Sequence, residues 1–105
     1  TGEIPQPVRD ALGKAAGMHQ AVAETRRQIQ DRQQRLTEVG KDQARVRENL
    51  KTIAQNTDYY TRQLKTLGDQ ETKIEGLQKE VADLQQKAAD QEKALADYAN
   101  GLTVG

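Results

Sequence analysis

Apolar side chains recur along the chain with gaps that alternate between three and four residues. The first series consists of Val8, Ala11, Ala15, Met18, Val22, Thr25, Ile29, Arg32, Leu36, Val39, Gln43, Val46, Leu50 and Ile53. An alternation kept for more than six heptads is typical of the buried seam of an α-helical coiled coil. Pro7 and Asp10 suit the first turn of such a helix, because a missing N–H costs nothing there and a carboxylate favours the positive helix end.

A second series follows after a short interruption. Its members are Tyr60, Leu64, Leu67, Glu71, Ile74, Leu77, Val81, Leu84, Ala88, Gln91, Leu95, Tyr98 and Leu102. Two consecutive gaps of three, ending at Leu77, predict a stammer that overwinds the supercoil locally. Asn100 and Gly101 then predict the helix end, with glycine at the usual capping place.

Residues 55–58, Gln-Asn-Thr-Asp, separate the two series and carry no apolar side chain. Asn56 tolerates the left-handed conformation that closes a helix, and Thr57 or Asp58 can cap the helix that follows. We therefore predict a helix over about 8–54, a turn at about 55–58 and a helix over about 58–100.

Two other architectures are open at this point. Turns at Gly40 and Gly68 would give a three-helix bundle that serves as a binding module. The seam keeps its phase across both glycines, which favours reading them as helix-interior residues that each cost about 1 kcal/mol against alanine. Phase also continues through Thr57, so one unbroken helix per chain, dimerising as an oligomerisation stalk, is the second alternative.

If the chain turns at 55–58, the two series meet where residue numbers add to about 113. The expected facing pairs include Val46 with Leu67, Leu36 with Leu77, Met18 with Leu95, Thr25 with Ala88, Gln43 with Glu71, and Arg32 with Val81. Gln43 and Glu71 would share a polar layer, which lowers stability but penalises wrong registers. Arg32 would lay its methylenes along the seam and keep its charge in water.

The composition agrees with a coiled coil rather than a compact globule. Among the 105 residues 34% are apolar and 30% charged, and there is no Phe, Trp or Cys, so a wide core cannot be built. Residues 1–56 carry ten Lys/Arg and seven Asp/Glu, and residues 57–105 carry six and nine. Halves of opposite net charge suit antiparallel partners, and neither half has the clustered basic face of a nucleic-acid binder.

The sequence thus predicts an all-α fold, a long antiparallel two-helix coiled-coil hairpin. Two hairpins packing into a four-helix bundle would bury more surface, so a homodimer is the expected self-association. Alanines off the seam would allow close approach: Ala21, Ala44, Ala82, Ala89 and Ala96.

Three segments carry a resemblance to a known group of proteins. They are the run Lys-Asp-Gln-Ala-Arg-Val-Arg-Glu-Asn-Leu at 41–50, the opening Ile-Pro-Gln-Pro-Val-Arg-Asp-Ala-Leu at 4–12, and the ending Leu-Ala-Asp-Tyr-Ala-Asn-Gly-Leu at 95–102. Together they resemble the C-terminal helical coiled-coil tail of an uncharacterised bacterial family with an upstream β-rich domain of unknown function. The resemblance implies a periplasmic or cell-envelope location. It also implies that residues 1–7 lead in from a missing upstream domain. The expected hairpin then takes residues 8–102, and 103–105 follow it as a short tail.

The sequence offers little chemistry. It has no Ser and no Cys nucleophile, and His19 is the single histidine without ligands at helical spacing. We expect no enzyme activity, no cofactor, no metal and no nucleic acid. No stretch is apolar enough to span a membrane, and a membrane-surface helix would need a basic polar face and large apolar residues.

The one candidate site is the hairpin tip, where Tyr59 and Tyr60 lie next to the predicted turn. Tyr60 fits the seam and Tyr59 points elsewhere. Tyrosine is enriched in binding hot spots, so we expect a protein partner to contact the tip, and the function to be that of a non-catalytic interaction or spacer module.

Overall fold

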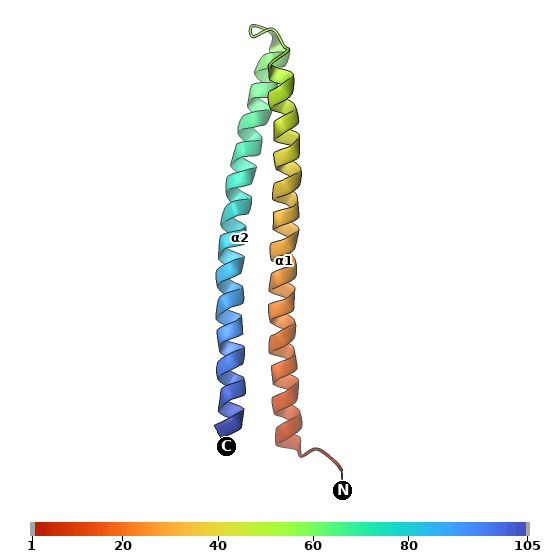
Figure 1. The fold of residues 1–105 in the computed structure, drawn as a ribbon, viewed down its shortest axis with the longest axis vertical. Helices are drawn as coiled ribbons and strands as arrows, with labels where there is room; N and C mark the ends of the chain where they lie inside the picture. The colour runs from red at the N-terminus through yellow and green to blue at the C-terminus, as the bar shows by residue number, and fades with distance from the viewer. Residues whose placement is uncertain (1, 105) are drawn as a thin grey trace. The chain divides into compact units, whose positions relative to one another are not determined.

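The computed structural model describes residues 2–104 and consists of two long helices (Figure 1). Helix α1 spans Gln6–Leu50, and helix α2 spans Asp58–Val104. Residues 51–57 connect them, and the described chain contains no strand. The predicted all-α helical hairpin is confirmed. Helix α1 runs through Gly40 and α2 runs through Gly68, so neither the three-helix bundle nor the single unbroken helix is correct.

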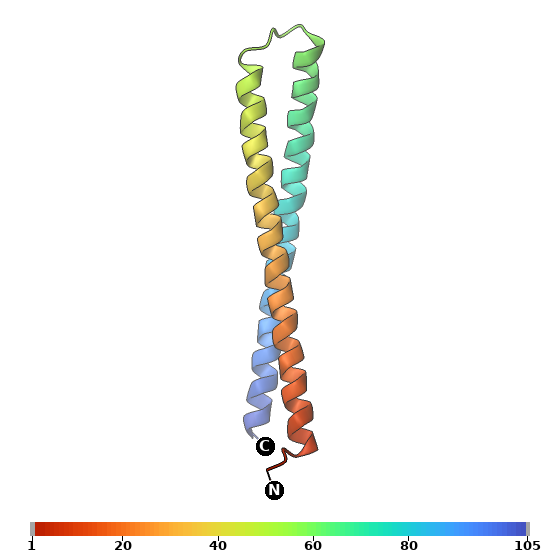
Figure 2. The same ribbon diagram turned by 90° about the vertical axis from the view of Figure 1, so that its right-hand side faces the viewer.

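The chain divides into two compact units, and both helices contribute to each. The terminal unit is Thr1–Ile29 with Asp83–Gly105, and the tip unit is Gln30–Ala82. Within each unit a segment of α1 lies antiparallel to a segment of α2 (Figures 1 and 2). Each unit is therefore a pair of antiparallel helices with a seam of its own.

In the terminal unit the buried side chains are Val22, Thr25 and Ala88. The Thr25 hydroxyl lies 2.7 Å from Oε1 of Gln91 and 3.1 Å from its own helix's Ala21 carbonyl oxygen. Thr25 was expected to face Ala88, and both are buried, but its polar partner lies one turn further along α2. The hydroxyl is thus satisfied inside the seam, as a buried polar group must be.

In the tip unit the buried side chains are Gln43, Val46 and Leu77. Gln70 donates from Nε2 to Oδ2 of Asp42 at 2.6 Å, and this bond joins the two helices beside the seam. Leu36, Val39, Ile74 and Val81 are half-buried around this centre. An apolar layer on either side of a polar one is the pattern that the sequence predicted for this region.

The cross-helix pairs fix the register of both units. The numbers of Arg26 and Glu92 in the terminal unit add to 118. The numbers of Arg47 and Glu71, 3.7 Å apart in the tip unit, give the same total. In each of these two pairs, both residues directly follow a seam position. In an antiparallel pair of helices, the residue numbers of such partners add to five more than the numbers of two facing seam residues. Facing seam residues therefore add to 113, which confirms the predicted register.

The seam of α2 differs from the prediction near its start. The covered positions of the seam are Tyr60, Gln63, Leu67, Gln70, Ile74, Leu77, Val81, Leu84, Ala88, Gln91, Leu95 and Tyr98, and Glu92 beside Gln91 is also half-buried. Their gaps alternate without a slip, so the predicted stammer at Leu77 is wrong. Leu64 is 47% exposed and Glu71 is also exposed, although both were assigned to the seam.

The reason is helix geometry. From Ile74 towards Tyr98 the apolar pattern fixes the phase of α2, and an unbroken heptad extended backwards arrives at Gln70 and Gln63. Keeping Leu64 in the seam would require local overwinding of the supercoil. As a consequence Gln43 lies opposite Gln70, so the predicted Gln43–Glu71 layer is replaced by a glutamine–glutamine layer.

The helix ends also depart from the expected positions. Helix α1 ends at Leu50, four residues before the predicted end, and Ile53 lies half-buried in the connection. Helix α2 continues through Gly101 to Val104. Among the described residues only Gly2 has positive φ, at 92°. Asn56 and Gly101 therefore do not adopt the left-handed capping conformation that we predicted for them.

The start of α1 is close to the prediction. The helix begins at Gln6, so Pro7 lies in its first turn, where proline needs no N–H partner. Asp10 falls just beyond that turn, which contains no acidic residue. Its Oδ1 instead accepts a hydrogen bond from Nε2 of Gln6 at 2.7 Å. This side-chain bond ties the first turn to the second.

Candidate interaction site at the hairpin tip

Local hydrogen bonds end α1 and set the course of the connection. The backbone N–H groups of Lys51 and Thr52 donate to the carbonyls of Glu48 and Asn49, at 3.2 and 3.1 Å. The Thr52 hydroxyl also donates to the Asn49 carbonyl at 3.0 Å. Such tightened bonds satisfy carbonyl groups that the end of an α-helix leaves without partners.

Thr57 caps the start of α2. Its Oγ1 accepts from the N–H of Tyr60 at 3.2 Å and donates to the carbonyl of Ala54 at 2.7 Å. Asp58 supplies a carboxylate in the first turn, where it favours the positive end of the helix. The prediction that Thr57 or Asp58 would cap this helix is confirmed for Thr57.

This cap places the two predicted site residues on different surfaces. Tyr60 is half-buried in the seam, and Tyr59 is 47% exposed. The guanidinium carbon of Arg62 lies 6.0 Å from the centroid of the Tyr59 ring, at the outer limit of a cation–π contact. The tip therefore presents one aromatic ring to solvent with a cation beside it.

Leu64, in the first two turns of α2, is a further exposed apolar residue. The apolar pattern of the sequence predicted that it would lie in the seam. Tyr59 directly precedes one seam position and Leu64 directly follows another, so they lie on opposite flanks of the seam. The heptad phase read backwards from Ile74 was the signal that could have identified Leu64 as a surface residue.

Asp42 of α1 accepts hydrogen bonds from both helices in the tip unit. Oδ1 of Asp42 accepts two hydrogen bonds from Arg45, at 2.6 and 3.1 Å, while its Oδ2 accepts from Gln70. The hydrogen bond with Asp42 raises the pKa of Arg45 above its ordinary value, with smaller contributions from the Asp42 charge and from Tyr59.

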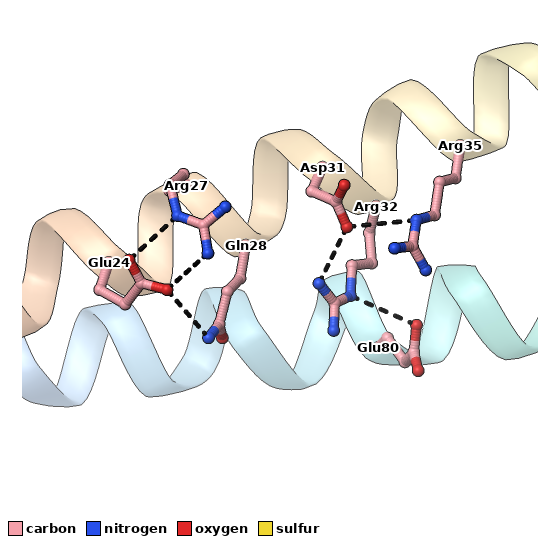
Figure 3. A network of polar contacts seen from close by, with 7 residues as sticks. All are labelled: Glu24, Arg27, Gln28, Asp31, Arg32, Arg35 and Glu80. Atoms are coloured by element: carbon pink, nitrogen blue, oxygen red, sulfur yellow. Dashed lines mark hydrogen bonds and ion pairs between the residues drawn. The ribbon is translucent and has the colours of Figure 1, made fainter.

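Figure 3 shows a second group of polar contacts in the tip unit. Oδ2 of Asp31 lies 3.0 Å from Arg32 and 3.2 Å from Arg35, and Arg32 reaches across to Glu80 at 3.6 Å. Arg32 was expected to keep its charge in water, but it is enclosed by carboxylates from both helices. Through the Arg32–Glu80 contact the group joins α1 to α2.

The same figure shows a related contact set in the terminal unit. Glu24 accepts from Arg27 at 2.7 and 3.0 Å and from Gln28 at 3.5 Å (Figure 3). The hydrogen bond from Arg27 lowers the pKa of Glu24, and the charge of Arg27 acts in the same direction. Exposed pairs of this kind, three and four residues apart, stabilise a helix only weakly.

Chemical groups that could hold a metal do not converge in the described chain. Among residues 2–104 no three His, Cys, Asp or Glu side chains are close enough to share an ion. His19 is exposed on α1. Within these residues neither helix has the length of apolar sequence that crossing a bilayer demands.

Comparison with known proteins adds no identity. The chain matches no protein-family model, no curated protein and no solved structure.

Proposed function

We propose that this chain is a non-catalytic coiled-coil interaction or spacer module that contacts a partner protein through its tip. The observation that carries the proposal is the exposed ring of Tyr59 at the start of α2. Tyrosine supplies large contact area at small entropic cost and is enriched in binding hot spots. Thr57 fixes the first turn of α2, so the ring is presented on a regular helix rather than on a loose loop.

The surroundings of Tyr59 support a protein partner. Leu64 is exposed on the other flank of the seam, while Arg62 lies close to the tyrosine ring. Aromatic and arginine residues are over-represented in protein interfaces. Arg45 is held by Asp42, so the tip does not present a purely basic surface of the kind that nucleic acid requires.

The proposal includes self-association and an envelope location. The coiled coil leaves much of its seam only half covered, and a second copy would cover more of it. The proposed location, the bacterial periplasm or cell envelope, rests only on the resemblance of the segments at 4–12, 41–50 and 95–102 to a bacterial coiled-coil tail. Subcellular fractionation of the source cells, with an antibody against the chain, tests that location.

The experiment that tests the tip uses the immobilised full chain as bait in an extract of the source cells. Tyr59→Ala should reduce the recovery of a specifically bound protein at least about tenfold, the size of a contact worth more than 1.4 kcal/mol. Thr66→Ala is the matched control, because Thr66 is exposed on the same flank one heptad further on. Circular dichroism checks that both variants keep their helix content.

Two results would overturn the tip proposal. One is equal recovery of every bound protein by Tyr59→Ala, Thr66→Ala and the unchanged chain. The other is that the unchanged chain retains no protein above the level of an unrelated helical bait.

A further inference from the structure

The terminal unit has two unequal flanks beside its seam. The Arg26–Glu92 ion pair joins the helices on one flank. The contact of Lys14 Nζ with the Tyr98 ring, 4.6 Å from the centroid, marks the other. Heptad spacing assigns six exposed side chains to the Arg26–Glu92 flank. We name them the alanine face: Leu12, Ala16, Ala23, Ala89, Ala96 and Ala99.

Charge is distributed unequally between the flanks. On the flank of the alanine face only three side chains carry a formal charge, Arg9, Arg26 and Glu92, and the last two neutralise each other. The uncharged His19 and Gln85 complete it. The opposite flank carries seven charged residues, namely Asp10, Lys14, Glu24, Asp83, Lys87, Asp90 and Asp97. One flank is thus suited to water, and the other is largely uncharged.

The alanine face is continuous with apolar seam surface that the hairpin leaves open. Among the apolar side chains of the terminal unit that the structure describes, only Val22 and Ala88 are buried. Met18 and Leu95 are half-buried. Leu12 is 56% exposed, and the seam residues Val8 and Leu102 are 46% and 47% exposed. Large apolar side chains therefore extend the face beyond its alanines.

We infer that the alanine face binds a second copy of this chain, giving a four-helix arrangement of two terminal units. This inference rests on the proposed function as an interaction module and names one of its partners. The contact is isologous, so the same face on both copies meets across a two-fold axis. Alanine side chains let helices approach to the short end of the usual 8–10 Å interaxial range.

The available area is sufficient for a stable contact. Residues 8–29 of α1 are about 33 Å long at 1.5 Å per residue. Two helices side by side are about 19 Å wide. Each copy can therefore bury about 600 Å², or about 1,200 Å² in total, which exceeds the roughly 1,000 Å² expected of a biological interface.

The charge pattern favours an identical copy over other occupants. Arg26 and Glu92 form a neutral pair on the face, so two copies can meet without like-charge repulsion and can exchange partners across the axis. A lipid surface would require a basic polar face and bulky apolar side chains. Five of the six residues of the alanine face are alanines, and its flank is not basic overall.

Sedimentation equilibrium of the full chain tests the inference. The unchanged chain should sediment as a dimer, and Ala96→Arg should weaken dimerisation at least about 100-fold, because two like charges are brought into a desolvated contact. Ala94→Arg is the matched control, since Ala94 is exposed on the same helix but on the charged flank. It should leave the dimer unchanged.

A second measurement does not depend on a disruptive substitution. The chain has no cysteine, so Ala96→Cys and Ala94→Cys each carry a single thiol. Alkylation of the thiol at 96 should slow at least about tenfold when the protein concentration is raised through the dimerisation midpoint. The thiol at 94 should react at one rate throughout.

A monomer at all concentrations, equal weakening by Ala96→Arg and Ala94→Arg, or equal protection of both thiols would overturn the inference. Pelleting of the chain with anionic lipid vesicles, lost in Ala96→Arg, would also overturn it in favour of a membrane surface. Tyr59→Ala should not change the dimer. Loss of dimerisation with intact capture by the tip, or the reverse, therefore separates this inference from the proposed function.

Discussion

Replacing Gln43 by leucine should stabilise the hairpin. Gln43 is only 7% exposed, and its Nε2 makes no hydrogen bond within the described chain. Its opposite residue, Gln70, uses Nε2 to bind Asp42, but its Oε1 is likewise without a hydrogen bond there. A buried donor left without a partner costs about 1–3 kcal/mol. Leucine has a similar size and no polar atom.

The expected gain follows from these terms. Removing the unsatisfied amide recovers part of the 1–3 kcal/mol, while the additional apolar burial is at the low end of about 1.5–3 kcal/mol because the glutamine methylenes are already covered. We expect a net increase of about 2 kcal/mol in the free energy of unfolding. For a chain of this size that raises Tm by about 8–16 °C.

Urea and thermal unfolding followed by circular dichroism at fixed protein concentration measure the effect. Gln34→Leu is the matched control, because Gln34 is exposed on the same helix and makes only a long 3.5 Å hydrogen bond to Glu38. It should change stability by no more than about 0.5 kcal/mol. A loss of stability in Gln43→Leu would refute the reasoning, since it would mean that the amide is well bonded in the folded chain.

Two further predictions test the helix interiors and the revised seam. Gly40→Ala and Gly68→Ala should each add about 1 kcal/mol to unfolding stability, because both lie inside helices and no atom beyond the adjacent residues and nearby backbone of the same helix would come within 4 Å of the added Cβ. A decrease of the free energy of unfolding in either urea titration would contradict the continuous helices. Leu64→Glu should change stability by about 0.5 kcal/mol or less, whereas Leu67→Glu should cost about 2 kcal/mol because a half-buried position would receive a charge. Equal losses would show that Leu64 lies in the seam after all.

Heptad periodicity, together with the turn and capping residues at 55–58, was sufficient to predict the fold and the register. Every predicted seam position of α1 from Ala11 to Leu50 is at least half-buried, and Val8 alone at its start is exposed. The prediction failed where hydrophobicity and phase disagree. Between Tyr60 and Ile74, hydrophobicity favoured Leu64 as the seam residue, whereas the unbroken heptad places the neighbouring Gln63 there. The hydrophobicity of one residue cannot decide which side chain enters the seam here, because the energy gained by an unbroken heptad is summed over the whole helix.

The connection was the other place where sequence reasoning was incomplete. Thr57 was identified as a cap because a hydroxyl before a helix has one dominant use. The end of α1 was placed too late because Ile53 continues the apolar pattern, although the chain has left the helix by residue 51. Asn56 carried the signature of a left-handed cap, yet 3₁₀-like bonds at Lys51 and Thr52 ended the helix without one. Several local solutions satisfy the same carbonyls, so residue type does not choose among them.

The polar positions explain how two weakly apolar helices select one register. Sliding α2 by one heptad, so that the numbers of facing seam residues add to 120 instead of 113, would place Gln43 against Leu77 and Gln70 against Leu50. Both amides would then face apolar side chains, and the Asp42–Gln70 bond would be lost.

The cross-helix ion pairs also disfavour sliding α2 by one heptad in the opposite direction. In the tip unit it would bring Arg47 to Leu64 instead of Glu71, and in the terminal unit it would bring Arg26 to Gln85 instead of Glu92. Each pair contributes little in the native register because both partners are largely exposed. Losing the cross-helix pairs in every alternative register still widens the gap between the native hairpin and its competitors, which is how a coiled coil trades stability for specificity.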